Sequence, residues 1–205
     1  MLTIFPGSIA SFNGTVTSIN GYDNSVELSC TAGTTSPPSP CIPTPGIVTP
    51  NSAGVAFSVN AGGSSLGEYN FNVQGLGTDP NNTTQVAALT LNVVDFSMTT
   101  PSPGTVIEPR GATSPAVSFQ IAAQGPFNQS VTLSCNVGQL VFGSTCGFTP
   151  SATFNLTSTV PVNATANVTM PAGTPVSPPN YTITIEANTA GAPTPLTSTF
   201  GVVPR

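Results

Sequence analysis

Two segments of this chain share one cysteine frame. Residues 25–30 read SVELSC and residues 130–135 read SVTLSC, and in each case a second cysteine, Cys41 or Cys146, follows eleven positions later. The residues between the two cysteines share almost nothing. A frame that is kept while its contents differ indicates two copies of one unit. In a chain of 205 residues, the offset from Cys30 to Cys135 predicts two domains, residues 1–95 and 96–205, with the seam near residues 94–100.

The chain carries very little charge. Charged residues make up 4% of it, against about 25% in a typical soluble protein, and its only cations are Arg110 and Arg205. With a net charge of −5 it lacks the basic face that nucleic acid requires, so we expect no nucleic-acid partner. No apolar run approaches the roughly 18 residues needed to span a bilayer, so we expect no membrane insertion.

Apolar and polar residues alternate in many short runs separated by Gly, Pro, Asn and Ser clusters. Such alternation is typical of strands with one buried and one solvated face, and no stretch shows a helical period. About seven short strands per hundred residues predicts an all-β chain of two tandem immunoglobulin-like Greek-key β-sandwich domains. The clearest runs are residues 55–59, 69–74, 89–93, 117–121, 131–135 and 181–186.

The cysteine strands suggest a structural role for the cysteines. In the pattern Val-x-Leu-Ser-Cys the Val, Leu and Cys face inward, so a disulfide within each pair, Cys30 with Cys41 and Cys135 with Cys146, would close a short loop between neighbouring strands. Loops of this size gain about 3 kcal/mol in the chain-entropy model. Immunoglobulin domains instead join opposite sheets, often against a Trp, which this chain lacks. An even cysteine count at a duplicated spacing predicts that the protein is exported, either secreted into the medium or held at the cell surface. The alternative is a four-thiolate metal site, which the absence of His and of Cys-x-x-Cys disfavours.

These residues also carry a family resemblance. Residues 127–135 (FNQSVTLSC), followed by residues 146–150 (CGFTP), resemble the bacterial immunoglobulin-like repeats that occur in tandem on large secreted and surface proteins. In those repeats an aromatic residue precedes Val-Thr-Leu-Ser-Cys and a Cys-x-Phe-x-Pro follows. The first half is less similar: Tyr22 precedes the cysteine strand, but residues 41–43 (CIP) lack the aromatic. The resemblance implies an exported module with a spacer, adhesive or assembly role, and it implies no catalytic residue.

The chain offers little for catalysis. Without His and Lys, and with its cysteines paired, it cannot assemble a Ser-His or Cys-His nucleophile or a Schiff base. Residues 78–83 (TDPNNT) could offer oxygens to calcium, but one carboxylate is a poor ligand set, so we interpret them as a turn. We expect no enzyme, no metal site and no cofactor. The seven acids are scattered at expected turns and wet strand faces, where solvated surface is the favoured interpretation: Asp23, Glu27, Glu68, Asp79, Asp95, Glu108 and Glu186.

The outward strand positions carry Thr, Ser, Asn and Gln where most proteins place charges. An acidic environment, attached glycans or burial against other copies of the protein would each explain this. Glycan acceptor sequons number eight, against about four expected by chance from the composition. These candidate glycosylation sites are Asn13, Asn81, Asn82, Asn128, Asn155, Asn163, Asn167 and Asn180.

The two ends of the chain suggest assembly. When Pro6-Gly7 is aligned with Pro103-Gly104, residues 200–203 align with residues 91–94, which lead into the second domain. The C-terminal segment therefore resembles the segment that precedes a domain in this chain. Subunits could then stack head-to-tail or add a terminal strand to a neighbour's sheet. The alternative is a fragment of a longer tandem array. The candidate assembly residues are Leu2, Ile4, Phe5, Phe200, Val202 and Val203.

The leading functional hypothesis is therefore a structural subunit of an extracellular filament, thread or surface layer whose partner is the protein itself. An adhesin or carbohydrate-binding module, with glycans as partners, is the second hypothesis, and spacer repeats of a larger secreted protein are the third. The adhesin hypothesis predicts exposed aromatic side chains at one end of a sandwich, for which Tyr22 and Phe127 are the candidates.

Overall fold

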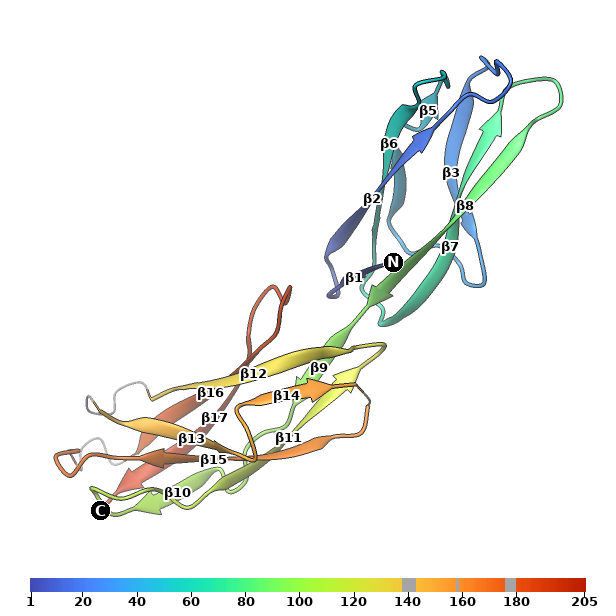
Figure 1. The fold of residues 1–205 in the computed structure, drawn as a ribbon. Helices are drawn as coiled ribbons and strands as arrows, with labels where there is room; N and C mark the ends of the chain where they lie inside the picture. The colour runs from blue at the N-terminus through green and yellow to red at the C-terminus, as the bar shows by residue number, and fades with distance from the viewer. Residues whose placement is uncertain (138–142, 158, 176–179) are drawn as a thin grey trace. The chain divides into compact units, whose positions relative to one another are not determined.

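The computed structural model describes residues 1–137, 143–157, 159–175 and 180–205. Within these ranges the chain forms seventeen strands and no helix (Figure 1). It divides into two compact units, Met1–Asp95 and Phe96–Arg205. The prediction of an all-β chain of two immunoglobulin-like sandwiches is confirmed.

The first unit consists of two sheets. The five-stranded sheet has the order β1 (Leu2–Ile4), β8 (Thr84–Val93), β7 (Gly67–Gly77), β3 (Val26–Ala32) and β5 (Ile47–Val48). The three-stranded sheet has the order β2 (Ile9–Val16), β6 (Val55–Gly62) and β4 (Cys41–Thr44). Between them Phe12 and Phe71 meet edge to face, with ring centroids 6.1 Å apart.

The second unit has one more strand. Its five-stranded sheet has the order β10 (Thr105–Glu108), β17 (Leu196–Pro204), β16 (Tyr181–Asn188), β12 (Gln129–Asn136) and β14 (Thr153–Leu156). Its other sheet has four strands: β13 (Thr145–Thr149), β15 (Val162–Thr169), β11 (Val117–Gln124) and β9 (Asp95–Met98).

The predicted alternation of buried and solvated residues is present in these strands. In β11, Val117, Phe119 and Ile121 are buried while the residues between them face water. In β12, Val131 and Leu133 are buried and Cys135 is half-buried, as the Val-x-Leu-Ser-Cys pattern predicts. The apolar faces of the two sheets together form the core of each unit.

Both disulfides form within their own unit, but each links opposite sheets. Cys30 lies in β3 and Cys41 in β4, with Cα atoms 6.2 Å apart. Cys135 lies in β12 and Cys146 in β13, with Cα atoms 6.3 Å apart. The expectation of a loop closed between neighbouring strands, in contrast to immunoglobulin domains, is therefore wrong. Between its two cysteines the chain leaves one sheet and enters the other, so the disulfide pins the two layers of the sandwich together.

The strand registers define which residues of the two units correspond. Val73 lies opposite Cys30, and Ile185 lies opposite Cys135, so β7 and β16 are equivalent strands. Four residues earlier in each, Tyr69 pairs with Leu91 and Tyr181 pairs with Val202. Val202 is therefore the counterpart of Leu91. The sequence alignment that matched residues 200–203 with residues 91–94 is wrong by two positions.

The first strands also correspond differently from the alignment on Pro-Gly. Strands β1 and β10 both pair in parallel with the last strand of their unit. Leu2 lies opposite Leu91 and Val106 lies opposite Val202, which makes Leu2 the counterpart of Val106. Pro6-Gly7 therefore does not correspond to Pro103-Gly104.

Strand β9 has no counterpart among residues 1–95, because Leu2 corresponds to Val106 and the positions equivalent to β9 fall before residue 1. Cys41 lies opposite Ala61 in β6, and Cys146 lies opposite Val168 in β15, so β2 and β11 occupy the same place beside β6 and β15. In the second unit β9 covers the outer edge of β11. Within residues 1–95, all of which the structure describes, no strand covers the outer edge of β2.

Candidate functional site

The open edge of β2 is the first component of the candidate site. Its eight residues, IASFNGTV, contain no charge and no proline. Natural proteins usually protect such an edge with Lys, Pro or a bulge, because an unpaired row of N–H and C=O groups attracts another strand. Strand β2 has neither of the first two devices, and its composition is compatible with pairing to a further strand.

The second unit shows how this edge is covered when a strand is present. The backbone of Ser118 exchanges two hydrogen bonds with that of Ser102, of 2.7 and 2.8 Å. The N–H of Thr99 donates to the carbonyl oxygen of Gln120 at 2.9 Å, and the N–H of Gln120 donates to Oγ1 of Thr99 at 2.8 Å. The counterparts of Ser118 and Gln120, 105 residues earlier, are Asn13 and Thr15. Their outward backbone groups therefore face the open edge of β2.

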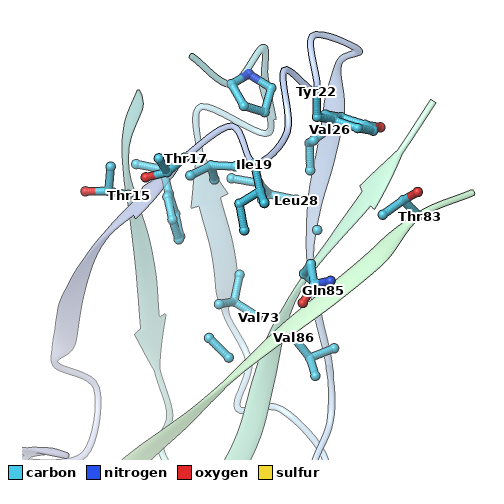
Figure 2. A pocket seen from close by; sticks show the side chains of 15 residues that line it. Thr15, Thr17, Ile19, Tyr22, Val26, Leu28, Val73, Thr83, Gln85 and Val86 are labelled. Atoms are coloured by element: carbon cyan, nitrogen blue, oxygen red, sulfur yellow. The ribbon is translucent and has the colours of Figure 1, made fainter. Parts of the chain in front are cut away.

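A cavity of about 320 Å³ lies beside this edge, between the two sheets of the first unit. Figure 2 shows Ile19, Val26, Leu28 and Val73 around it, with Thr83, Gln85 and Val86 along its β8 side. None of its lining residues is charged. They are Thr15, Val16, Thr17, Ile19, Tyr22, Val26, Leu28, Pro50, Phe57, Val73, Gly75, Thr83, Gln85, Val86 and Ala87.

The corresponding region of the second unit is closed. Phe96 of β9 is 5% exposed, and its ring lies against Phe127, with centroids 5.6 Å apart. Phe127 is the counterpart of Tyr22, which lines the cavity of the first unit. Ile121 is fully buried, whereas its counterpart Val16 is only half-buried. The first unit is therefore open where the second holds Phe96.

One rim of the cavity is fixed by a hydrogen bond between two loops. The hydroxyl of Tyr22 donates to Oδ2 of Asp79 at 2.7 Å. The same carboxylate accepts the backbone N–H groups of Asn81 and Thr83, at 2.9 and 3.2 Å. The hydrogen bond from Tyr22 holds the pKa of Asp79 below its ordinary value, while burial and the neighbouring carboxylate raise the pKa of Tyr22. Gly77 is needed beneath this contact, because a Cβ there would overlap the Tyr22 hydroxyl.

This geometry agrees with a turn at residues 78–83. The Asp79 carboxylate accepts all three hydrogen bonds, and these order its own loop and the loop of Tyr22. Among the described residues, no group of three or more His, Cys, Asp or Glu side chains could hold a metal ion.

Two of the seven acids are not solvated surface. Asp79 is 7% exposed and Glu108 is 3% exposed, so the interpretation of all seven as wet surface groups is wrong for these two. Burial raises the pKa of the Glu108 carboxyl. Asp79 was misplaced because its partner Tyr22 lies 57 residues away in the sequence.

The candidate aromatic residues for an adhesive surface separate into two cases. Phe127 is 2% exposed and belongs to the core of the second unit. Tyr22 is half-buried at the rim of the cavity.

The candidate assembly residues lie mostly inside their own units. Phe5, Phe200 and Val202 are 5% exposed or less, and Ile4 and Val203 are half-buried, whereas Leu2 is 38% exposed. Their side chains are thus largely committed to intramolecular packing. The corrected register also leaves residues 95–104 without counterparts among residues 1–95, so the resemblance between the two ends of the chain is weaker than the sequence alignment indicated.

The sequon asparagines are nearly all accessible. Asn167 is half-buried, and the remainder are exposed. Asn155 accepts a hydrogen bond from the Ser130 hydroxyl, and Oδ1 of Asn163 accepts one of 3.0 Å from Nε2 of Gln120. The candidate glycosylation sites are therefore open to modification.

No helix in the described ranges is long and apolar enough to cross a membrane.

Comparison with known proteins identifies fold similarity alone. No protein-family model and no curated protein sequence matches this chain. Among solved structures, the D00-D0 domain of intimin aligns over 98% of this chain and 94% of its own, with a TM-score of 0.46 and 10% identity. The sialic acid binding region of the Streptococcus sanguinis SK1 adhesin covers 99% of this chain and 75% of its own (TM-score 0.33, 12% identity). The E. coli chaperone DraB covers 98% and 93% (TM-score 0.35, 14% identity).

Similarities at these levels support no conclusion about partners or activity. The strand topology itself defines the class: the chain is a tandem pair of immunoglobulin-like β-sandwiches, each with a disulfide between its sheets.

Proposed function

We propose that this protein is a structural subunit of an extracellular filament or surface layer, assembled by strand addition between subunits. The open edge of β2 is the observation that carries the proposal. It is eight residues long and free of charge and proline, and no strand within residues 1–95 pairs with it, whereas β9 pairs with the equivalent edge of β11. An added strand would supply the hydrogen bonds that Thr99 and Ser102 supply in the second unit.

Two further features support a structural role outside the cell. The disulfides pin both sandwiches, which suits an oxidising compartment in which the subunit must resist unfolding. The sparse charge of the chain lowers the cost of burying its faces and edges against other subunits. In this proposal the protein is exported, non-enzymatic and has other subunits as its main partners.

A second candidate function is an adhesin or carbohydrate-binding module, and the cavity beside Tyr22 is the observation that favours it. Carbohydrate recognition needs several convergent polar groups as well as an aromatic surface. The cavity is lined chiefly by Val, Ile, Leu, Phe and Ala side chains, with Tyr22, Gln85 and three threonines as the polar groups. Its chemistry therefore suits an apolar side chain better than a sugar.

Electron microscopy of the native, unreduced protein tests the proposal. We expect long fibres or sheets, and we expect Thr15→Pro to abolish them, because proline removes the outward N–H of an edge strand without breaking its pairing to β6. Thr15→Val, which keeps the N–H, is the matched control and should assemble normally. Monodisperse single particles at high concentration would contradict the proposal and make a glycan-binding screen the next experiment.

A further inference from the structure

We infer that the second sandwich is N-glycosylated on both of its outer faces, at Asn163 in β15 and at Asn155 in β14. Each asparagine would carry a covalently attached oligosaccharide, so these are modification sites rather than binding sites for a free sugar. The inference does not depend on the proposed filament, because glycans would solubilise the same faces in an adhesin or a spacer.

The two asparagines project from opposite sheets of the sandwich. Side chains of a strand alternate between its two faces, and Asn155 stands between Phe154 and Leu156, which are both buried. Asn163 precedes the buried Ala164 in the same way. Asn155 therefore lies on the outer face of the five-stranded sheet and Asn163 on that of the four-stranded sheet, and both are exposed.

The amide group of each asparagine is oriented by one hydrogen bond to its oxygen. Oδ1 of Asn163 accepts a bond of 3.0 Å from Nε2 of Gln120 on β11, and Oδ1 of Asn155 accepts one from the hydroxyl of Ser130 on β12. Neither Nδ2 atom donates a hydrogen bond to any residue that the structure describes. Nδ2 is the atom that carries the sugar in an N-linked glycan, and in both residues it is free to do so.

Other outward-facing asparagines use this atom inside the protein. Nδ2 of Asn70 donates to Oε1 of Glu68 at 2.6 Å, and Nδ2 of Asn72 donates to the carbonyl oxygen of Ala32 at 3.0 Å. Neither asparagine belongs to a sequon. Seven of the eight sequon asparagines are exposed, against five of the nine others. The sequons thus coincide with accessible amides, which a polar strand face alone does not require.

The second sequon of β15 provides an internal comparison. Asn167 is half-buried, and its amide lies against Gly147 in the edge strand β13, where a Cβ would come within 2.6 Å of Oδ1 of Asn167. An amide packed against a neighbouring strand leaves less room for a sugar. We therefore expect Asn167 to stay unmodified.

The surroundings of Asn163 lack the charge that usually keeps a surface soluble. On this face Asn163 lies opposite Gln120, and Thr165, the hydroxyl residue of its sequon, lies between Ser118 and Thr149. None of these residues is charged, whereas about 25–35% of a typical designed surface is. A bulky hydrophilic glycan solubilises such a face without charge.

The modification joins Nδ2 of the asparagine to C1 of the first sugar. The donor is an oligosaccharide linked through phosphate to a lipid, supplied by the exporting cell. The bond from C1 to the phosphate oxygen breaks, the lipid phosphate leaves with the electron pair, and Nδ2 loses one proton. The two disulfides suit the exported location that this chemistry requires.

Glycopeptide mass spectrometry of the native protein tests the inference directly. The protein is digested, and its peptides are fragmented by electron transfer, which leaves each sugar on its asparagine. We expect an oligosaccharide on Asn163 and on Asn155, and none on Asn167. If either Asn163 or Asn155 is found only in unmodified form, the inference is overturned.

Variants of the sequon hydroxyl separate glycosylation from any other role of the asparagine side chain. Thr165→Ala removes the Asn163 sequon without changing Asn163, and Thr165→Ser keeps the sequon. Produced in the native host, Thr165→Ala should lose one glycan in an intact-mass measurement, and Thr165→Ser should lose none. Thr157→Ala and Thr157→Ser form the same pair for Asn155. Retention of every glycan by either alanine variant would overturn the inference at that site.

A matched control tests the selection between the two sequons of β15. Thr169→Ala removes the Asn167 sequon from the same face of the same strand. This variant should keep the full number of glycans. Loss of a glycan from it would overturn the selection of Asn163 over Asn167.

Discussion

The ring of Phe96 lies 5.6 Å from the ring of Phe127, centroid to centroid, and both side chains are almost completely buried. This contact closes one end of the second sandwich. In the first unit, Tyr22 takes the place of Phe127 and lines a cavity. The two units share one architecture, and residues 1–95 contain no equivalent of the strand that carries Phe96.

The first prediction concerns this contact. Phe96→Ala should destabilise the second unit by about 3 kcal/mol, because it removes a buried aromatic side chain and leaves a cavity. Denaturant unfolding followed by amide NMR signals of each unit measures the effect, and the first unit should be unchanged. Phe96→Leu, which keeps most of the apolar volume, is the control and should cost less. A loss below about 0.5 kcal/mol for Phe96→Ala would show that β9 does not close the sandwich.

The second prediction concerns pH and the hydrogen bond between Tyr22 and Asp79. The pKa of folded Asp79 lies below its ordinary value of 3.8, so its contribution to stability is present above that pH and is lost as the pH falls through the folded pKa. The pKa of Tyr22 is raised above 10.0, so the hydroxyl remains a donor at neutral pH and beyond. Tyr22→Phe should raise the pKa of Asp79 and weaken the acid dependence of the first unit. A carbon-detected NMR titration of the Asp79 carboxyl checks this, and an unchanged pKa would refute it.

The third prediction concerns Glu108, whose pKa is raised above its ordinary value of 4.5 by burial. Folding then favours the protonated form, so the stabilising contribution is fully present below pH 4.5 and is lost as the pH rises through the folded pKa. Glu108→Gln keeps a neutral, similarly shaped side chain. It should make the second unit more stable than the unmodified chain at pH 7, and the advantage should shrink below pH 4.5. Thermal unfolding at both pH values measures this, and a less stable variant at pH 7 would count against it.

The fourth prediction concerns the disulfides. Replacing Cys30 and Cys41 together by Ser should destabilise the first unit by about 3 kcal/mol, as expected for a closed loop of this length. The second unit, whose disulfide joins Cys135 and Cys146, should be unaffected. Urea unfolding with separate NMR probes for the two units would measure this. The reciprocal replacement of Cys135 and Cys146 is the control, and equal destabilisation of both units by either replacement would contradict the prediction.

Much of the fold follows from sequence patterns because a sandwich strand has a strict period of two. The alternation in residues 117–121 and 131–135 predicted both the strands and their buried residues correctly. The same period explains the principal error. Shifting a strand by two residues keeps every apolar residue on the same face, so the pattern could not distinguish Phe200 from Val202 as the counterpart of Leu91. Only the pairing of Tyr69 with Leu91 and of Tyr181 with Val202 resolves the register.

The candidate site was not predictable in the same way. The cavity depends on which strands lie side by side, and strand order is a property of the fold rather than of any local pattern. Likewise, nothing in the residues between Cys30 and Cys41 indicates that the chain passes there from one sheet to the other. One sequence signal did point to this region: Tyr22 and Phe127 each precede the cysteine strand of their unit. The two residues occupy equivalent positions, but Tyr22 is half-buried and Phe127 is packed against Phe96.

Hydrogen exchange at the edge of β2 tests the central claim, that the first unit accepts an added strand, most directly. In dispersed protein, the amides of Asn13 and Thr15 should exchange rapidly, while those of Ser118 and Gln120, which are already bonded to Ser102 and Thr99, should be protected. In the native assembly, Asn13 and Thr15 should become as protected as Ser118 and Gln120. Rapid exchange of Asn13 and Thr15 in the assembled protein would show that the outer edge of β2 stays unpaired and would contradict the account.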